Sequence, residues 1–140
     1  MYSSRSAFSE PIARSAFILT GSGTDPDGDA LTYTWEQNDP QNPNSAAAPA
    51  ATRVNGPMFR SIRGTTSPTR YMPALATVLA GNTANTWEVC PSVARTLNFS
   101  LTTRDNKAGG GQTASDLMKV TVSGTAGPFL VSVPNTNVTW

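Results

Sequence analysis

The decisive stretch of this sequence is Gly21-Ser22-Gly23-Thr24-Asp25-Pro26-Asp27-Gly28-Asp29-Ala30-Leu31-Thr32-Tyr33-Thr34-Trp35. It opens on glycines, passes through a short turn that holds three carboxylates, and closes on an alternating run. Leu31, Tyr33 and Trp35 alternate with threonines, so their large side chains share one face of a strand. The stretch therefore predicts the end of one strand, an acidic turn, and a second strand with an apolar face.

Alternation of apolar and polar residues predicts further strands on both sides of this stretch. It is clearest in a hairpin, where Leu97, Phe99 and Leu101 alternate with polar residues and a glycine-rich turn follows. No helical period emerges, and the prolines within 38–57 would break one there. The expected strands span 16–22, 30–37, 58–62, 69–72, 96–104 and 116–123. They predict an all-β, Ig-like antiparallel β-sandwich of about seven strands.

Length and spacing place these strands in one domain. The chain has 140 residues, enough for a single domain to bury a core without a metal or a disulfide. We expect a sandwich over 16–124, preceded by an irregular segment or first strand over 1–15. An insertion over 75–94 interrupts it, and 125–140 forms a linker and the start of a following module. The expected core comprises the apolar residues on the inward strand faces: Phe17, Leu19, Trp35, Leu97, Phe99, Leu101, Val120 and Val122.

The composition is poor in charge. Charged residues make up 14% of the chain, against about 25% in average soluble proteins, and hydroxyl and amide residues, glycine and proline replace them. Such a balance is typical of extracellular β-proteins, so we expect a secreted protein. A net charge of +1 creates no field for nucleic acid or an acidic membrane surface. No apolar run approaches the roughly 18 residues of a membrane span.

The chain lacks the residues of common catalytic centres. It has no histidine and a single cysteine, Cys90. A Ser-His-Asp triad and a cysteine nucleophile with its histidine base are therefore excluded, as are the usual zinc sites. We expect Cys90 to be a small, partly buried thiol and the chain not to be an enzyme.

The acidic turn has two interpretations. Asp25, Asp27 and Asp29 stand at alternate positions, and in an Ig-like topology the loop with Asp105 lies at the same end of the sandwich. Carboxylates from two loops suit calcium, which takes about 6–8 oxygen ligands. The Asp-Pro-Asp-Gly unit at 25–28 is equally an ideal type I turn that needs no metal. A calcium site and a solvated acidic turn both remain open.

Other candidate residues have structural interpretations beside their functional ones. Asp39 follows the end of a strand and is expected on the surface. We expect Trp87 to cover the insertion, the alternative being part of a glycan-binding platform. Three arginines surround a Thr/Ser/Pro loop, and their stems are expected to pack over aromatic neighbours, with an anion or glycan contact as the alternative. These are Arg60, Arg63 and Arg70.

The ordered blocks of this chain resemble PKD-like (Ig-like) domains. Those domains carry one block similar to Thr24-Asp25-Pro26-Asp27-Gly28-Asp29-Ala30-Leu31-Thr32-Tyr33-Thr34-Trp35. A later block is similar to Leu97-Asn98-Phe99-Ser100-Leu101-Thr102-Thr103-Arg104-Asp105-Asn106, and a valine-rich strand such as Val120-Thr121-Val122 follows. The likeness covers about residues 16–124 and implies an Ig-like sandwich. The insertion over 75–94 is longer than simple PKD-like domains carry.

A narrower likeness concerns the middle of the chain. Its segments Gly56-Pro57-Met58-Phe59-Arg60-Ser61, Thr66-Ser67-Pro68-Thr69-Arg70-Tyr71 and Trp87-Glu88-Val89 are similar to modules of multidomain secreted bacterial zinc metalloproteases of the reprolysin-like group. The resemblance implies a non-catalytic accessory or spacer module whose partners are neighbouring domains of the same polypeptide. The protease's zinc-binding histidine motif is absent, so that activity does not carry over. The alternative function is a binding module for extracellular polysaccharide or fibrous protein.

Overall fold

The computed structural model of this protein describes residues 14–40 and 48–126. Within them the chain forms five strands and one short helix, arranged as two antiparallel sheets. The prediction of an all-β fold is confirmed, whereas the described residues contain five of the expected seven or so strands. The prediction of a first strand within 1–15 and that of a following module after 125 fall almost wholly outside the described residues.

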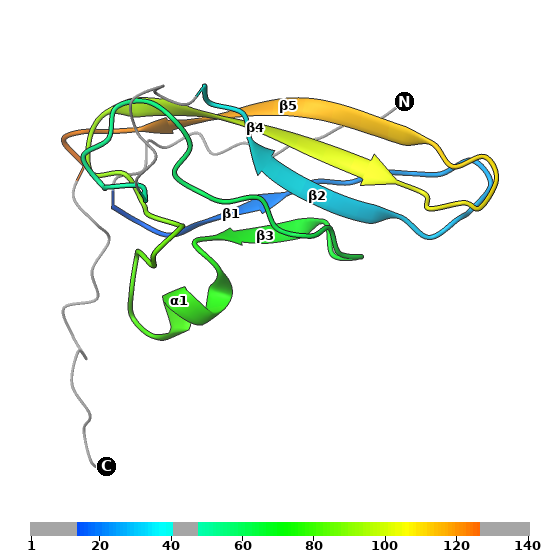
Figure 1. Cartoon of the computed structure of the whole chain (residues 1–140), viewed down its shortest axis with the longest axis horizontal. Helices are drawn as coiled ribbons and strands as arrows, with labels where there is room; N and C mark the ends of the chain where they lie inside the picture. The colour runs from blue at the N-terminus through cyan, green and yellow to red at the C-terminus, as the bar shows by residue number, and fades with distance from the viewer. Residues whose placement is uncertain (1–13, 41–47, 127–140) are drawn as a thin grey trace, which may run out of the picture.

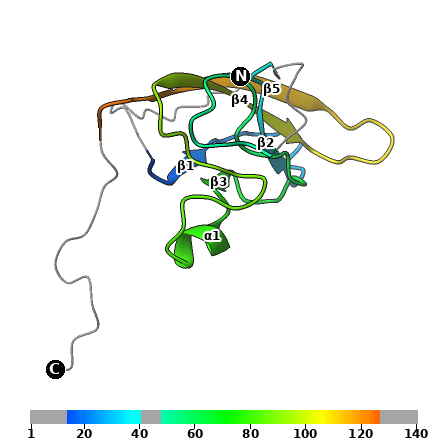
Figure 2. The same ribbon diagram turned by 60° about the vertical axis from the view of Figure 1, so that its left-hand side comes forward.

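The two sheets form two layers, which Figure 1 shows one above the other. The smaller sheet pairs β1 (Phe17–Thr20) with β3 (Thr69–Met72). A short helix, α1 (Leu75–Leu79), follows β3. In the turned view of Figure 2, α1 lies on the opposite side of this sheet from β4 and β5.

The larger sheet has the strand order β2-β4-β5 and contains β2 (Thr32–Gln37), β4 (Arg95–Arg104) and β5 (Thr113–Val122). Trp35 on β2 lies opposite Leu101 on β4. β4 and β5 pair over their full length of 10 residues each. The predicted hairpin is thus confirmed, and its second strand begins at Thr113 rather than at 116, because the ladder continues to the edge of the glycine-rich turn.

Two expectations about the middle of the chain are wrong. The segment 58–62 is not a strand, and Phe59 makes only an isolated bridge to Glu88. A side chain holds the start of this segment instead. Gln37 Oε1 accepts hydrogen bonds from the backbone N–H of Met58 (2.8 Å) and of Phe59 (3.1 Å). The insertion over 75–94, for which no helix was predicted, contains α1.

The core between the sheets contains all eight residues that alternation placed inward. Trp35 is among them at 3% exposed, and its indole N–H donates a hydrogen bond to the Pro68 carbonyl at 3.0 Å. Phe17, Phe59 and Phe99 contact one another with ring centroids 5.5–6.2 Å apart, a spacing at which aromatic pairs attract beyond their area burial. β3 adds Met72 to the core, and the long loops supply the other buried members of the cluster: Met58, Phe59, Val89 and Cys90.

Gly21 allows the close approach of the chain that leaves β1 to the larger sheet. A β-carbon built at this position would lie 2.2 Å from Leu101 Cδ2 and 3.3 Å from the Trp35 ring. Any side chain here would push apart two residues at the centre of the core. The glycine that opens the decisive stretch is therefore required for packing of the two layers.

Candidate functional site

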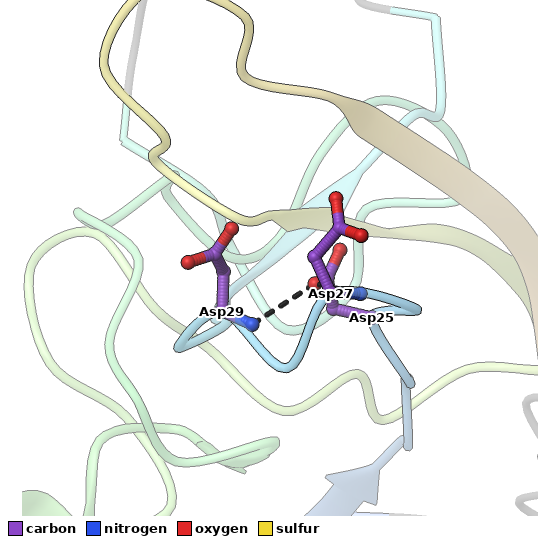
Figure 3. A group of neighbouring side chains, drawn as sticks. All are labelled: Asp25, Asp27 and Asp29. Atoms are coloured by element: carbon purple, nitrogen blue, oxygen red, sulfur yellow. Dashed lines mark hydrogen bonds between the residues drawn. The ribbon is translucent and has the colours of Figure 1, made fainter.

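The acidic turn between β1 and β2 gathers the three predicted carboxylates, as Figure 3 shows. Each of Asp25, Asp27 and Asp29 offers one oxygen, and these oxygens lie within 4.8 Å of one another. Gly28 has φ +79° and donates its N–H to the Asp25 carbonyl at 3.2 Å, which closes the turn. Asp25 Oδ2 accepts the backbone N–H of Asp27 (3.0 Å) and of Asp29 (2.9 Å).

The loop between β4 and β5 meets the acidic turn, as the Ig-like topology predicted. The contact is made by Lys107, whose Nζ donates to both carboxylate oxygens of Asp29 at 3.0 and 2.9 Å. This hydrogen bond and the charge of Asp29 raise the pKa of Lys107 above its ordinary value. Lys107 therefore neutralises part of the acidic charge at this end of the sandwich.

Asp105 has a different role from the other three acids. Its carboxylate accepts the backbone N–H of Lys107 at 3.1 Å and of Gln112 at 2.9 Å, so it holds the β4–β5 loop in shape. These backbone hydrogen bonds lower the pKa of Asp105. In the part of the chain that the structure describes, the close cluster contains Asp25, Asp27 and Asp29 without Asp105.

The donor set of this cluster suits a hard cation that keeps much of its water. Carboxylate oxygens are the ligands calcium prefers, and three of them leave at least three of about six positions to carbonyls or water. The Lys107 ammonium would compete with a cation for Asp29. The arrangement can act either as an ion-paired turn or as an exchangeable calcium site.

A buried ion pair joins β3 to the region before β4. Arg70 Nη2 lies 2.8 Å from Glu88 Oε1, and the two side chains are 6% and 4% exposed. The guanidinium also donates to the carbonyls of Trp35 and Arg60, and Glu88 Oε2 accepts the N–H of Ala74 at 2.8 Å. The Arg70 guanidinium is therefore bound to a buried carboxylate, whereas packing of its stem over aromatic neighbours stays a prediction.

A second buried pair holds the loop before β3 against β4. Arg95 donates to the carbonyls of Arg53 (2.9 Å) and Gly56 (2.7 Å), and its Nη2 lies 3.8 Å from Asp39 Oδ2. Burial lowers the pKa of Arg95. Asp39 accepts two hydrogen bonds from Asn98, at the backbone N–H and the side-chain amide. The expectation that Asp39 lies on the surface is therefore wrong. Its side chain is only 6% exposed, because it accepts the backbone N–H of Asn98 in β4.

Cys90 has the environment of an unreactive thiol. It is 3% exposed within the core, and its Sγ–H points at the Met72 carbonyl at 3.8 Å. Burial, and secondarily the charge of Glu88, raises the pKa of Cys90 to about 12. Because the thiolate is the nucleophile, this pKa leaves almost none of it at neutral pH.

A surface groove of about 200 Å³ runs between β2 and β3. We call it the β2–β3 groove. Sequence patterns gave no signal for it, since its walls come from segments distant in the chain. Four segments line it: 33–35 of β2, the loop residues Ile62, Arg63, Thr65 and Ser67, 69–71 of β3, and Ala74 with Leu75.

The aromatic residues divide between the core and the surface. Trp35 and the three contacting phenylalanines are buried. Tyr71 lines the β2–β3 groove and is 36% exposed, while Trp87 is 50% exposed. Trp87 is thus half open to solvent, and its role in covering the insertion stays a prediction.

Comparison of this chain with protein-family models, with curated proteins and with solved structures gives no match. The likeness to PKD-like domains therefore stays a prediction carried by the sequence blocks alone. No helix within 14–40 and 48–126 has the length and apolar character that a membrane crossing requires.

Proposed function

We propose that this chain is a non-catalytic, PKD-like accessory module that spaces and orients neighbouring domains of a secreted multidomain metalloprotease. The observation that carries the proposal is that buried polar side chains bind backbone groups and so connect the loops to the sheets. Arg70, Glu88 and Arg95 bind loop backbone. Asp39, which itself lies in a loop, binds the backbone of Asn98 in β4. A domain whose loops are held in this way transmits orientation between its two ends as one body.

Buried ionisable groups of a catalytic site would instead face a cleft and keep some hydrogen-bond donors or acceptors free for the substrate. Here Glu88 uses one oxygen on Arg70 and the other on Ala74. Cys90 is protonated and enclosed. These contacts support a structural role for the groups that would otherwise be candidates for acid–base or nucleophilic work.

Calcium fits this proposal as a stabiliser of one end of the module. The cluster of Asp25, Asp27 and Asp29 would bind the ion with water, and Asp105 would keep the facing loop in position. The ion would draw the acidic turn together and relieve repulsion among its carboxylates. Such stabilisation would serve the spacer role, because it would stiffen the end of the sandwich where two loops meet.

The spacer role can be tested by single-molecule energy transfer between two folded reporter domains fused to the ends of the chain. A rigid module predicts a narrow distance distribution. The control is a fusion in which a Gly/Ser linker of equal length, 140 residues, replaces the chain, since such linkers behave as flexible coils. A distribution as broad as that of the linker would contradict the proposal.

A second candidate function is a binding module for extracellular protein or polysaccharide. The observation that favours it is the β2–β3 groove with the exposed ring of Tyr71 on its wall. The two functions are compatible, because the groove lies beside the smaller sheet and the acidic turn lies at a strand end.

A further inference from the structure

The β2–β3 groove runs along an open strand edge. β3 pairs only with β1 among the described strands, and Gly21 N–H donates to the Pro68 carbonyl at 3.1 Å in the same ladder. Hydrogen-bonded and non-hydrogen-bonded pairs alternate along an antiparallel ladder, so Thr69 and Tyr71 direct their backbone groups away from β1. Thr69 and Tyr71 line the groove whereas β1 does not, and from this we infer that the groove lies along the open edge of β3.

The backbone of Tyr71 is the free position on this edge. Thr69 N–H already donates a hydrogen bond to Ser67 Oγ at 3.2 Å. Within the described residues, no comparable partner exists for the N–H and C=O of Tyr71. An unpaired N–H and C=O on a strand edge form a template for an added strand, which gains main-chain hydrogen bonds there.

The size of the groove limits what it can enclose. Its volume of about 200 Å³ is below the roughly 300–1,000 Å³ of sites that enclose a drug-sized ligand. Its apolar lining includes Ile62 and Leu75, which are 45% and 42% exposed. A space of this size and character accommodates one large apolar side chain rather than an oligosaccharide.

The rim of the groove is positively charged. Its lining contains two arginines and no acidic residue. The charge of Arg70 is balanced by the buried Glu88, whereas Arg63 is exposed at the groove. An occupant with a carboxylate near Arg63 would complement this charge.

The wall opposite β3 is already in place without a ligand. Tyr33 and Thr65 exchange backbone hydrogen bonds of 2.7 and 3.1 Å, which hold the loop against β2. Gly64 makes this approach possible, because a β-carbon there would lie 2.4 Å from Thr34 Oγ1 and 2.9 Å from the Tyr33 carbonyl oxygen. A preformed wall spares an incoming ligand the entropy of ordering it.

From these features we infer that the β2–β3 groove binds an extended peptide by strand addition to β3. The peptide places one large apolar side chain in the groove between Ile62 and Leu75, and a carboxylate beside Arg63. This inference rests on the binding-module function proposed above and does not depend on the spacer role. The free backbone edge favours a peptide over a saccharide, which cannot continue a β-ladder.

The test is fluorescence anisotropy with a labelled, capped heptapeptide that has a central phenylalanine flanked by valines and a glutamate at each end. We expect saturable binding that weakens with salt. Arg63→Glu should weaken it about tenfold or more, while Arg60→Glu, in the same loop but outside the groove lining, should change it little. Leu75→Asp should abolish binding, and Leu79→Asp, on the same helix and 78% exposed, is its control.

Two further probes separate the alternatives. The same peptide with a methylated backbone nitrogen at its centre should bind about tenfold more weakly, because strand addition needs that N–H. Cellohexaose is the saccharide probe. Binding of cellohexaose without the peptide would overturn the inference while leaving a binding module intact. If neither the peptide nor cellohexaose binds, both the strand-addition inference and the binding-module function are overturned. If Arg63→Glu and Arg60→Glu weaken peptide binding equally, the peptide does not bind in the β2–β3 groove.

Discussion

The ion pair of Arg70 and Glu88 shows what single residues contribute to this fold. Its two side chains reach backbone groups of Trp35, Arg60 and Ala74, which belong to three separate segments. Desolvating two charges is costly, and the additional hydrogen bonds to backbone offset that cost. The pair therefore matters less for net stability than for the unique arrangement of the segments around it.

Removing one charge of this pair should be costly. We expect Glu88→Gln to destabilise the protein by about 3–5 kcal/mol, because Arg70 is left as an uncompensated buried cation. Glu36→Gln, on the outward face of β2, is the matched control and should stay within about 0.5 kcal/mol. The measurement is urea unfolding at neutral pH. Equal midpoints for the two variants would contradict the role given to the pair.

Cys90 provides a readout of opening of the core. Its pKa of about 12 in the folded state lies above the ordinary thiol value of 9.0, so folding favours the protonated thiol. The stability that this contributes is complete below pH 9 and is lost as pH rises toward 12. At pH 8 we expect a disulfide reagent to modify Cys90 only after unfolding by urea. Immediate modification of the folded protein would show that the thiol is accessible.

At the scale of elements, the sequence predicted the strands better than the segments between them. Apolar and polar residues alternate in β2 and β4 because one face of their sheet packs on the apolar core, and that period can be read without a partner. The segment 58–62 also looked like a strand, but Gln37 satisfies its backbone from the side, a contact between distant residues. Local pattern carries no information about such contacts.

The same distinction applies to the candidate site. Asp25, Asp27 and Asp29 share one turn, so their proximity was predictable from spacing. Asp105 lies on another loop, and its use as a cap for Gln112 depends on the conformation of that loop. The β2–β3 groove was not predictable at all, since it exists only where the loop that contains Gly64 approaches β2.

Calcium binding to the acidic turn is testable by thermal unfolding. We expect calcium to raise the midpoint, since binding only the folded state adds about 2.7 kcal/mol at a hundredfold excess over Kd. Magnesium should act more weakly because it gives up water reluctantly. Asp27→Asn should reduce the shift. Lys107→Met should enlarge it, because the ammonium no longer competes for Asp29.

A second outcome would change the interpretation of this turn. If millimolar calcium leaves the midpoint of the wild-type protein unmoved, the turn is a solvated and ion-paired one. In that case Lys107→Met should lower the midpoint only slightly, because solvent screens an exposed ion pair and leaves it little net stability. The calcium-induced shift of Lys107→Met is therefore larger than that of the wild-type protein if the turn binds calcium and absent if it does not, which makes the variant decisive.

At the scale of the whole molecule, the two sheets are small and the loops complete the core between them. Leu101 lies at its centre, 3% exposed and opposite Trp35. We expect Leu101→Ala to cost about 2–5 kcal/mol in a single cooperative transition, measured together by tryptophan fluorescence and far-ultraviolet dichroism. Leu117→Ala, at a residue 75% exposed on β5, should cost little. Separate transitions by the two probes would show that the sheets unfold independently.

We propose that polar side chains hold the long loops to the sheets and so make the described chain one rigid module. Native-state hydrogen exchange can measure this at the N–H groups that donate to Gln37 and Glu88. We expect the amides of Met58, Phe59 and Ala74, although outside any strand, to exchange nearly as slowly as the amide of Phe99 in β4. Exchange of these loop amides at the rate of unprotected peptide, while Phe99 stays protected, would contradict it.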